Sequence, residues 1–548
     1  MSISERIFEY NTVVDLMQAR ARNTPDRLAV NVAGRPVSCA QLAELAEQCA
    51  GGLAALGVVK GDRVASMLFN SIEQIVVWFA AARIGAIWVP LNVGLLGDDL
   101  AYTLTDAAPK VLVCDTEAAA KIAAVKAQVQ AKGQGQVSAR YFIVGEVVPE
   151  GFAPFSALLS TAVLAPVALA RKDPAVIVYT GGTTGMPKGV VLPHFAWIAA
   201  AYRYVDAFDI RPDDCHYSVL PLFHVAGSMI GFLGPYLAGI PSHFDRWFSV
   251  SNFWERARET GATIIDPIGT MVTLLCQAPA NESDRDHRVR VSLAVLSQVP
   301  QQIANHYPLR FGVDLVNVYS LSESGGTLIV HNKADSPKIQ SNGKPWGWCE
   351  LRIGADDDHS LPPNQIGEIL LRPTLPDTFM IGYYNNPERT LECFRNLWLH
   401  TGDLGYVDEE GYLFFTGRHA HWLRCRGENV SAYEVEDIMS RYPNIREVAV
   451  VGVPAPLGEE DIKAFIIAET SVKLDPADII MWCKEHMANF KLPRYIVFCD
   501  EFPRSTTKRE VERHKLKAMT DVQVWDAEQA LSGRGYRSSS GTSAGRKS

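Results

Sequence analysis

One stretch of the sequence has the composition of a loop that binds phosphate groups. Residues 176–194 read VIVYTGGTTGMPKGVVLPH, in which an apolar run of strand length precedes a run of small residues and then Lys188. Glycines let the backbone approach a ligand and turn its N–H groups toward an anion, and hydroxyl and ammonium groups add donors and charge. The stretch therefore predicts a polyphosphate site, with donors from Thr180, Gly181, Gly182, Thr183, Thr184, Gly185 and Lys188.

Two other interpretations of this stretch are less favoured. It is not a Walker A loop, because no Gly-Lys-Ser/Thr closes it and Pro187 directly precedes Lys188. An ordinary hairpin turn seldom needs so many consecutive glycines and threonines. Phosphate binding remains the interpretation that uses all of these residue types.

Polar residues at the ends of other β-like or apolar runs are further candidates. His224 lies in the apolar segment LPLFHVAG, Glu323 ends VNVYSLSE, and Asp403 ends HTGD. A lone histidine among apolar residues is more often structural, and a glutamate at a strand end is often only solvated. A carboxylate is nevertheless a natural ligand for a hard cation such as Mg²⁺ that bridges phosphates. Asp403 has two oxygens that can accept hydrogen bonds from a pair of hydroxyls.

The size and charge of the chain limit the class of protein. At 548 residues, two to four domains are expected, and 47% hydrophobic with 21% charged residues is ordinary for a globular protein. A net charge of -9 argues against a nucleic-acid partner. Ten cysteines without a CxxC pair or a Cys/His cluster favour reduced thiols. The charged N-terminus lacks the apolar core of a signal peptide, and no apolar run reaches the roughly 20 residues of a membrane span. We therefore expect a cytoplasmic protein.

The elements that must position these residues alternate between strand and helix in the first 170 residues. Such alternation predicts an α/β fold with a largely parallel sheet. The expected helices are Val13–Arg22, Ile72–Ile84 and Glu117–Lys132, and the expected strands are Val64–Leu68, Ile87–Pro90 and Val111–Cys114. Apolar runs between residues 435 and 498 predict a smaller α+β domain of about 100 residues. The end of the chain, of which Ser532–Ser548 is rich in Gly, Ser and Arg, predicts a disordered tail over 526–548.

The phosphate-loop stretch resembles the signature of the adenylate-forming superfamily of acyl-CoA synthetases, luciferases and adenylation domains, with Gly181 in place of the common serine. Five such signatures occur in order over roughly residues 10–520. The resemblance implies a large N-terminal domain of sheets flanked by helices over 1–417. It also implies a small, mobile domain over 418–525 that rotates about a hinge near 418–420, where relatives carry Asp or Lys and this chain has Ala420.

The resemblance also implies roles for the candidate residues. Thr183 and its neighbours contact the phosphates of ATP during catalysis, and His224 lies between the acyl pocket and the adenylate. Glu323 holds Mg²⁺. The remaining nucleotide contacts come from Tyr319 on adenine, Ser322 on a phosphate, Asp403 on the ribose hydroxyls and Arg418 at the domain junction.

The C-terminal signatures are similar but less regular. Arg426, Gly427 and Glu428 lie in a segment that resembles the loop facing the active site when the pantetheine thiol of coenzyme A attacks. The Arg-Gly-Glu-Asn-Val-Ser form of this segment is typical of carnitine- and crotonobetaine-type acyl-CoA ligases. The lysine that bridges carboxylate and phosphate corresponds to Lys508 if the loop is one residue shorter, with Arg509 as the alternative. Leu293–Pro300 departs from the usual Gly-Gly-Ala-Pro turn.

The implied function is an ATP-dependent acid–CoA ligase with ATP, Mg²⁺ and coenzyme A as cofactors. A small carboxylic acid attacks the α-phosphate to give an acyl-adenylate and pyrophosphate, and the thiol then displaces AMP. Two alternatives remain open: an acyl-AMP ligase that loads a carrier protein, and a catalytically weakened nucleotide-binding relative. The sequence does not identify the acid, and a homodimer is neither required nor excluded.

Overall fold

The computed structural model describes the chain from residue 9 to residue 531 with gaps. The described residues are 9–131, 139–180, 186–294, 296, 299, 301–330, 338, 341–345, 347–355, 357–418, 422–425, 428–455, 458–469, 472, 474–503, 511, 513–519 and 522–531. The chain forms two compact units, a larger one from residues within 1–419 and a smaller one mainly from residues within 420–548. The predicted domain boundary near 417/418 remains a prediction.

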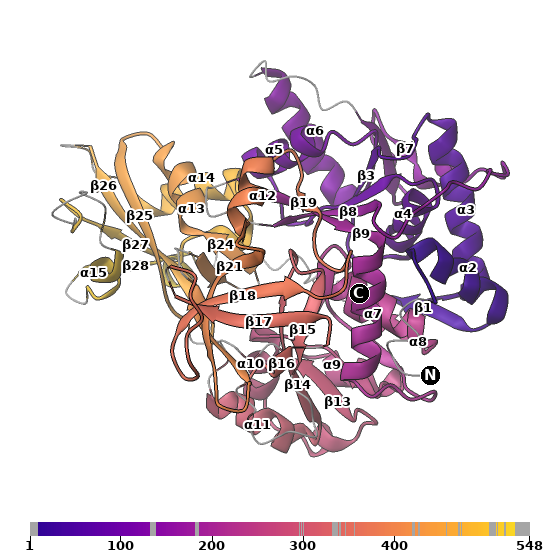
Figure 1. Ribbon diagram of the computed structural model, residues 1–548. Helices are drawn as coiled ribbons and strands as arrows, with labels where there is room; N and C mark the ends of the chain where they lie inside the picture. Colours follow the sequence, from indigo (N-terminus) through magenta and orange to yellow (C-terminus); the bar gives the residue numbers. More distant parts are fainter. Residues whose placement is uncertain are drawn as a thin grey trace. The chain divides into compact units, whose positions relative to one another are not determined.

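The phosphate-loop strands belong to the first sheet of the larger unit (Figure 1). Its described strands have the order β19-β9-β8-β4-β3-β5-β6-β7. From β8 to β7 the neighbours are parallel, and β8–β9 and β9–β19 are antiparallel. The bounds are β3 Arg63–Met67, β4 Ile87–Pro90, β5 Val111–Asp115, β6 Arg140–Val144, β7 Ala153–Pro154, β8 Pro174–Thr180, β9 Lys188–Pro193 and β19 Gly382–Tyr383.

The second sheet carries the strand that ends near Glu323. Its described order is β16-β15-β14-β13-β12-β10-β11-β1-β2, with parallel pairing from β14 to β1. The bounds are β1 Leu28–Val32, β2 Arg35–Ser38, β10 His216–Ser218, β11 Ser242–Phe244, β12 Ile264–Ile265, β13 Val291–Ala294, β14 Asp314–Leu321, β15 Gly326–Val330 and β16 Lys344–Pro345. The predicted α/β class with largely parallel sheets is confirmed.

A third, antiparallel sheet carries the HTGD segment. Its described strands are β17 Cys349–Gly354, β18 Gly367–Pro373, β20 Phe394–Arg395, β21 Trp398–Val407 and β22 Leu413–Arg418, and β18 and β22 both pair with β21. The sequence analysis did not predict this sheet, although its strand β21 is 10 residues long.

Helices cover the sheets of the larger unit, and their ends follow local sequence signals. Thr12 and Asp15 form a capping box at the first helix, and Ser71 accepts a hydrogen bond from the N–H of Gln74 at the start of another. The helices are α2 Val13–Asn23, α3 Cys39–Ala55, α4 Ile72–Arg83, α5 Gly97–Ala107, α6 Thr116–Ala131, α7 His194–Ala207, α8 Gly234–Ala238, α9 Phe253–Glu259, α10 Thr270–Gln277, α11 Gln301–Phe311 and α12 Pro387–Cys393. Among the described residues, no helix is long and apolar enough to cross a membrane.

A π-helix, η2 Ala226–Leu233, directly precedes α8. Its residues are nearly all buried, as the apolar composition of Ser228–Ile240 predicts. π-helices are rare and frequently lie at functional sites. This π-helix begins two residues after His224, a predicted site residue.

The smaller unit is a sheet with a core on each face. Its described strands β25 Ile445–Pro454, β26 Glu460–Ala468, β27 Tyr495–Phe498 and β28 Trp525–Asp526 lie side by side in that order. Successive residues of a strand point to opposite faces, so Ile466 joins one apolar cluster and Phe465 the other. The helices are α13 Ala432–Ser440, α14 Pro476–His486, α15 Arg513–Lys517 and α16 Ala527–Ala530.

The predicted tail starts too early at residue 526. Trp525 pairs with Ile496 in the sheet, and the side chain of Asp526 caps α16. Ala527 and Leu531 are buried in the core of the smaller unit. Residues 526–531 thus belong to the folded unit, because pairing and burial against distant residues outweigh their polar surroundings in the sequence. Residues 532–548 lie outside the described residues.

Candidate active site

The two ends of the predicted phosphate loop are fixed by neighbouring strands. Thr180 ends β8, Lys188 begins β9, and the two residues pair with each other in the antiparallel ladder. Gly181, Gly182, Thr183, Thr184 and Gly185 lie outside the described residues. Tyr179, directly before the loop, donates a hydrogen bond from its hydroxyl to Asp106 Oδ2 at 2.6 Å. The described ends of the loop, Thr180 and Lys188, therefore lie at a strand-to-strand junction.

Glu323 and Lys188 meet at the same tyrosine. The Tyr383 hydroxyl donates to Glu323 Oε1 at 2.9 Å, and the Lys188 ammonium lies 5.2 Å from the centre of the Tyr383 ring. The N–H of Met380 donates to the Glu323 carbonyl at 2.9 Å. Burial lowers the pKa of Lys188, and the Glu323 carboxylate partly opposes that effect. Ser322 is half-buried directly before Glu323.

The surroundings of Glu323 fit a magnesium ion that is shared with a phosphate ligand. Among the described residues, no group of three or more His, Cys, Asp and Glu side chains could hold a metal by itself. Within the same part of the chain, the hydrogen bond from Tyr383 to Oε1 is the one found to the Glu323 carboxylate. Mg²⁺ commonly takes one or two carboxylates and completes its shell with substrate phosphates and water. One carboxylate near Lys188, at the described end of the predicted phosphate loop, suits this kind of binding.

Tyr319 and Asp403 form a buried pair although they are far apart in the sequence. The Tyr319 hydroxyl donates to Asp403 Oδ2 at 2.8 Å, and both residues are buried. The Tyr319 ring lies 6.1 Å, centre to centre, from that of Phe415. Asp403 also pairs through its backbone with Arg418, whose side chain lies outside the described residues. The structure thus brings together the two residues that the sequence assigned to adenine and ribose.

The HTGD turn is held to the neighbouring strand β18. The Thr401 hydroxyl donates to the Ile369 carbonyl at 2.7 Å and accepts from the Asp403 N–H at 3.1 Å. The N–H of Gly402 donates to Glu368 Oε1 at 2.9 Å. Gly402 has φ +70°, a backbone conformation that favours glycine because a Cβ would strain it. These contacts fix the direction in which Asp403 leaves the strand.

His224 is half-buried at the end of a tightly held turn. The buried side chain of Asn70 donates to the carbonyls of Leu220 and Asp245, each at 3.1 Å, and accepts from the Leu222 N–H at 2.7 Å. A Cβ on Gly227 would lie 2.1 Å from the Pro221 carbonyl oxygen, so only glycine fits there. The loop before η2 is therefore rigid, and His224 is presented from it.

The predicted sites of the smaller unit are only partly described. Glu428 begins β24 Glu428–Ser431 and pairs with Cys425 of β23 Trp422–Cys425. Arg426, Gly427, Ala420, Lys508 and Arg509 lie outside the described residues. Their assigned roles remain predictions.

Sequence reasoning missed three residues that hold the candidate site together. Tyr383, Asn70 and Glu368 contact Glu323, the LPLFH turn and the HTGD turn, respectively. The signals in the sequence are weak: two adjacent tyrosines before Asn-Asn-Pro, an asparagine after an apolar strand, and a Gly-Glu at a strand start. None of these patterns predicts a contact by itself.

Comparisons with known proteins agree with this geometry. The model of the AMP-binding enzyme family matches residues 17–384, and that of the AMP-binding enzyme C-terminal domain matches residues 434–509. The chain is 32% identical over 486 residues to a crotonobetaine/carnitine–CoA ligase of Salmonella agona, covering 88% of this chain and 93% of that protein.

Solved structures share the fold. An anthranilate–CoA ligase, AuaEII, in complex with anthranoyl-AMP has a TM-score of 0.69 and 26% identity, covering 94% of this chain and 98% of that chain. A fatty acyl-CoA synthetase of Mycobacterium tuberculosis has a TM-score of 0.67 and 26% identity, with coverage of 93% and 98%. The amide bond synthetase McbA of Marinactinospora thermotolerans, at TM-score 0.81 and 22% identity with coverage of 92% and 98%, shares the fold alone.

The chain belongs to the AMP-binding enzyme family, whose model covers most of its larger unit. Within that family it is an acid–thiol ligase, an AMP-forming acyl-CoA synthetase. Such enzymes act in two steps, of which the first gives an acyl-adenylate and pyrophosphate and the second gives acyl-CoA and AMP.

Proposed function

We propose that this ligase activates a small carboxylic acid with MgATP and then passes the acyl group to coenzyme A. The proposed site for activation lies around Glu323, Lys188, Tyr319 and Asp403. One observation carries the proposal. Tyr319 contacts Asp403, while Glu323, four residues later, meets Tyr383 beside Lys188. Four residues of chain span at most about 14 Å. That separation suits a nucleoside at one end and its phosphates at the other.

Charge accounts for the first step. A carboxylic acid with an ordinary pKa near 4 is ionised at pH 7, so it needs no general base before it attacks the α-phosphate. The barrier comes from repulsion between this anion and the triphosphate. Lys188 and the donors of the phosphate loop would lower that barrier by binding phosphate oxygens. Glu323 would hold a magnesium ion, which would supply positive charge to the phosphates.

The second step needs a thiol and a different set of residues. We propose that Arg426, Gly427 and Glu428 face the acyl-adenylate in this step, and that Lys508 or Arg509 serves the first step. A smaller domain that rotates about residues 418–420 between the steps would account for both sets.

The ten cysteines of the chain, all described and none in a disulfide, support the cytoplasm as its compartment.

A panel of acids tests the function directly. Pyrophosphate release is measured with ATP and each acid, including the crotonobetaine, carnitine and anthranilate named for the relatives, first without and then with coenzyme A. The expected result is acid-dependent pyrophosphate release, followed by thioester formation only when coenzyme A is present. Release without any thioester would favour a carrier-protein thiol, and no release with any acid would favour the weakened relative.

Glu323→Gln tests the assigned metal ligand. The amide keeps the shape of the side chain but removes the anion, so adenylation should fall by about two orders of magnitude or more. The measurement is pyrophosphate release at saturating ATP, with thioester formation from supplied acyl-AMP as the internal control. A variant with the wild-type rate would remove Glu323 from the reaction.

A further inference from the structure

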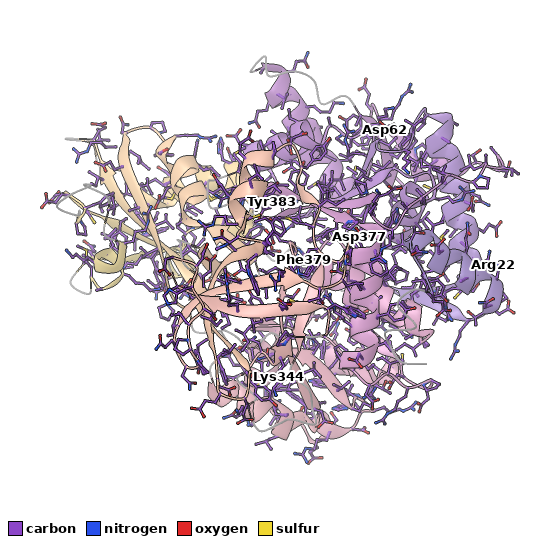
Figure 2. All side chains as sticks on the ribbon, in the orientation of Figure 1. Arg22, Asp62, Lys344, Asp377, Phe379 and Tyr383 are labelled. Carbon is purple, nitrogen blue, oxygen red and sulfur yellow. The ribbon has the colours of Figure 1, made fainter. Side chains whose placement is uncertain are left out.

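Residues 379–386 form a strap, a short segment that contacts Glu323, Lys188 and the strand β9. Figure 2 labels Phe379 and Tyr383 on it, and Figure 1 shows its strand β19 beside β9. The N–H groups of Ile381 and Tyr384 donate to the carbonyls of Val191 at 2.8 Å and Gly189 at 2.7 Å. The strap is thereby fixed to the strand that leaves the phosphate loop.

The strap is also fixed on two other sides. At its start, the Met380 N–H donates to the Glu323 carbonyl at 2.9 Å. Near its end, the Asn385 side chain donates to Asp106 Oδ1 at 3.1 Å, and the other oxygen of Asp106 accepts from the Tyr179 hydroxyl. The backbone of the strap therefore has little freedom, and it holds Tyr383 in a defined place between Glu323 and Lys188.

The Tyr383 hydroxyl donates in this contact, and the carboxylate oxygen Oε1 of Glu323 accepts. One oxygen of Glu323 is held by the protein, which leaves Oε2 as the oxygen that a metal ion can take.

We propose that Tyr383 is a positioning residue for the adenylation step, whose hydroxyl fixes the carboxylate of Glu323 for Mg²⁺ while its ring supports the Lys188 ammonium. This inference rests on the proposed role of Glu323. Residues that orient a metal ligand by a hydrogen bond typically change metal affinity or activity by about 10- to 100-fold when they are removed. The ring face attracts the ammonium independently of the hydroxyl.

Tyr383→Phe separates these two contributions, because it removes the hydroxyl and keeps the ring. We expect the Mg²⁺ concentration needed for half-maximal pyrophosphate release to rise by about tenfold. Calorimetric binding of ATP should weaken in the presence of Mg²⁺ and stay unchanged in EDTA. Thioester formation from supplied acyl-AMP should keep its wild-type rate. A purely structural role would instead affect both half-reactions and both binding experiments.

Tyr384→Phe is the matched control on the same strap. The Tyr384 ring lies near the guanidinium of Arg63, at 5.8 Å, and does not reach Glu323 through any hydrogen bond of the described residues. Its Mg²⁺ dependence should equal that of the wild type. If Tyr383→Phe also shows the wild-type Mg²⁺ dependence, the inference is overturned.

The double variant Tyr383→Phe/Glu323→Gln distinguishes this inference from the proposed function. If Tyr383 acts through Glu323, its change adds nothing further to the Mg²⁺ dependence of the Glu323→Gln variant. If the two substitutions instead shift the Mg²⁺ dependence independently, so that their effects multiply in the double variant, the inference is contradicted while the proposed role of Glu323 stands. An unchanged Mg²⁺ dependence in Glu323→Gln alone would contradict the proposed function itself.

Discussion

At the scale of single residues, Asp403 is a buried charge held in a defined direction. The carboxylate is buried, accepts from the Tyr319 hydroxyl and leaves a turn that is held by Thr401 and Glu368. A buried carboxylate needs donors, and a nucleotide can supply them through its ribose hydroxyls. Removing Asp403 should therefore weaken the binding of ATP.

Asp403→Ala should raise the KM for ATP at least about tenfold, because a hydrogen bond to a charged group is worth roughly 1.5–3 kcal/mol. The KM for the acid should change much less. Steady-state pyrophosphate release at varied ATP measures the effect, and circular dichroism verifies that the variant is folded. An unchanged ATP dependence in a folded variant would mean that Asp403 does not contact the nucleotide.

Local sequence patterns predict some of these site residues and not others. Short motifs after apolar runs contain Tyr319, Glu323 and Asp403, so the neighbouring residues in the sequence indicate their chemistry. Tyr383 acts on a residue 60 positions away, and Asn70 on one 152 positions away. Their roles depend on which strands become neighbours, and spacing within one segment does not contain that information.

At the scale of elements, the turn before η2 depends on one side chain. Asn70→Ala leaves the N–H of Leu222 and the carbonyls of Leu220 and Asp245 without their partner. Each unsatisfied buried group costs about 1–3 kcal/mol. We expect a lower thermal midpoint and a KM for the acid that rises more than the KM for ATP. Asn305→Ala, at an exposed position on α11, is the control and should change neither value. Equal changes in both KM values would show that Asn70 supports the fold only.

The first residue of α7 gives the protein a dependence on pH. Burial lowers the pKa of His194 to about 4, although the Asp173 carboxylate partly opposes that effect. Because the unfolded histidine has a pKa near 6.5, the unfolded state binds more protons between about pH 6.5 and pH 4. Stability from the neutral side chain is complete above pH 6.5 and is lost as the pH falls, by up to about 2 kcal/mol at pH 5.

His194→Gln should flatten this acid-side loss of stability. Thermal midpoints measured from pH 7 to pH 5 should fall less steeply in the variant than in the wild type, even if the variant is less stable at pH 7. His306→Gln, at an exposed position, should keep the wild-type slope. Equal slopes in all three proteins would contradict the assignment to His194.

Element ends were predictable where local signals decide them. The helix predicted for Ile72–Ile84 is α4 Ile72–Arg83, since Ser71 caps its start and Gly85, with φ +72°, follows its end. The end of the folded chain was not predictable in the same way. The segment 526–531 is short and largely polar. It joins the core through the pairing of Trp525 with Ile496, a residue distant in the sequence, and through the burial of Ala527 and Leu531.

At the scale of the whole molecule, each unit has its own apolar core and its own part of the proposed reaction. The core of the larger unit packs around α4 and α7, and the smaller unit has one apolar cluster on each sheet face. Units with separate cores can each stay folded while they act in turn. The residues assigned to only one half-reaction should therefore affect only that half.

Lys508→Ala and Arg509→Ala test this division of labour. Replacing the residue that bridges carboxylate and phosphate should strongly reduce pyrophosphate release. Thioester formation from supplied acyl-AMP should stay nearly normal. We expect Lys508 to be the sensitive residue. A sensitive Arg509 would mean that a guanidinium has taken the role, since it can donate two hydrogen bonds to a phosphate. Normal adenylation in both variants would show that the C-terminal signature was misassigned.

The π-helix η2 allows the length of the chain to change next to His224. A π-helix holds more residues per turn than an α-helix, so a deletion of one codon within 226–233 can restore α-helical spacing without breaking the chain. The wide turn takes up the extra residue, so such a deletion removes one side chain from the turn and leaves the flanking residues in place. His224 lies before the π-helix, and Gly234, fitted against the ring of Tyr204, lies after it. If His224 has its proposed place beside the acid, inherited changes in length here would alter the side chains near the acid and leave strands β8 and β9 unchanged.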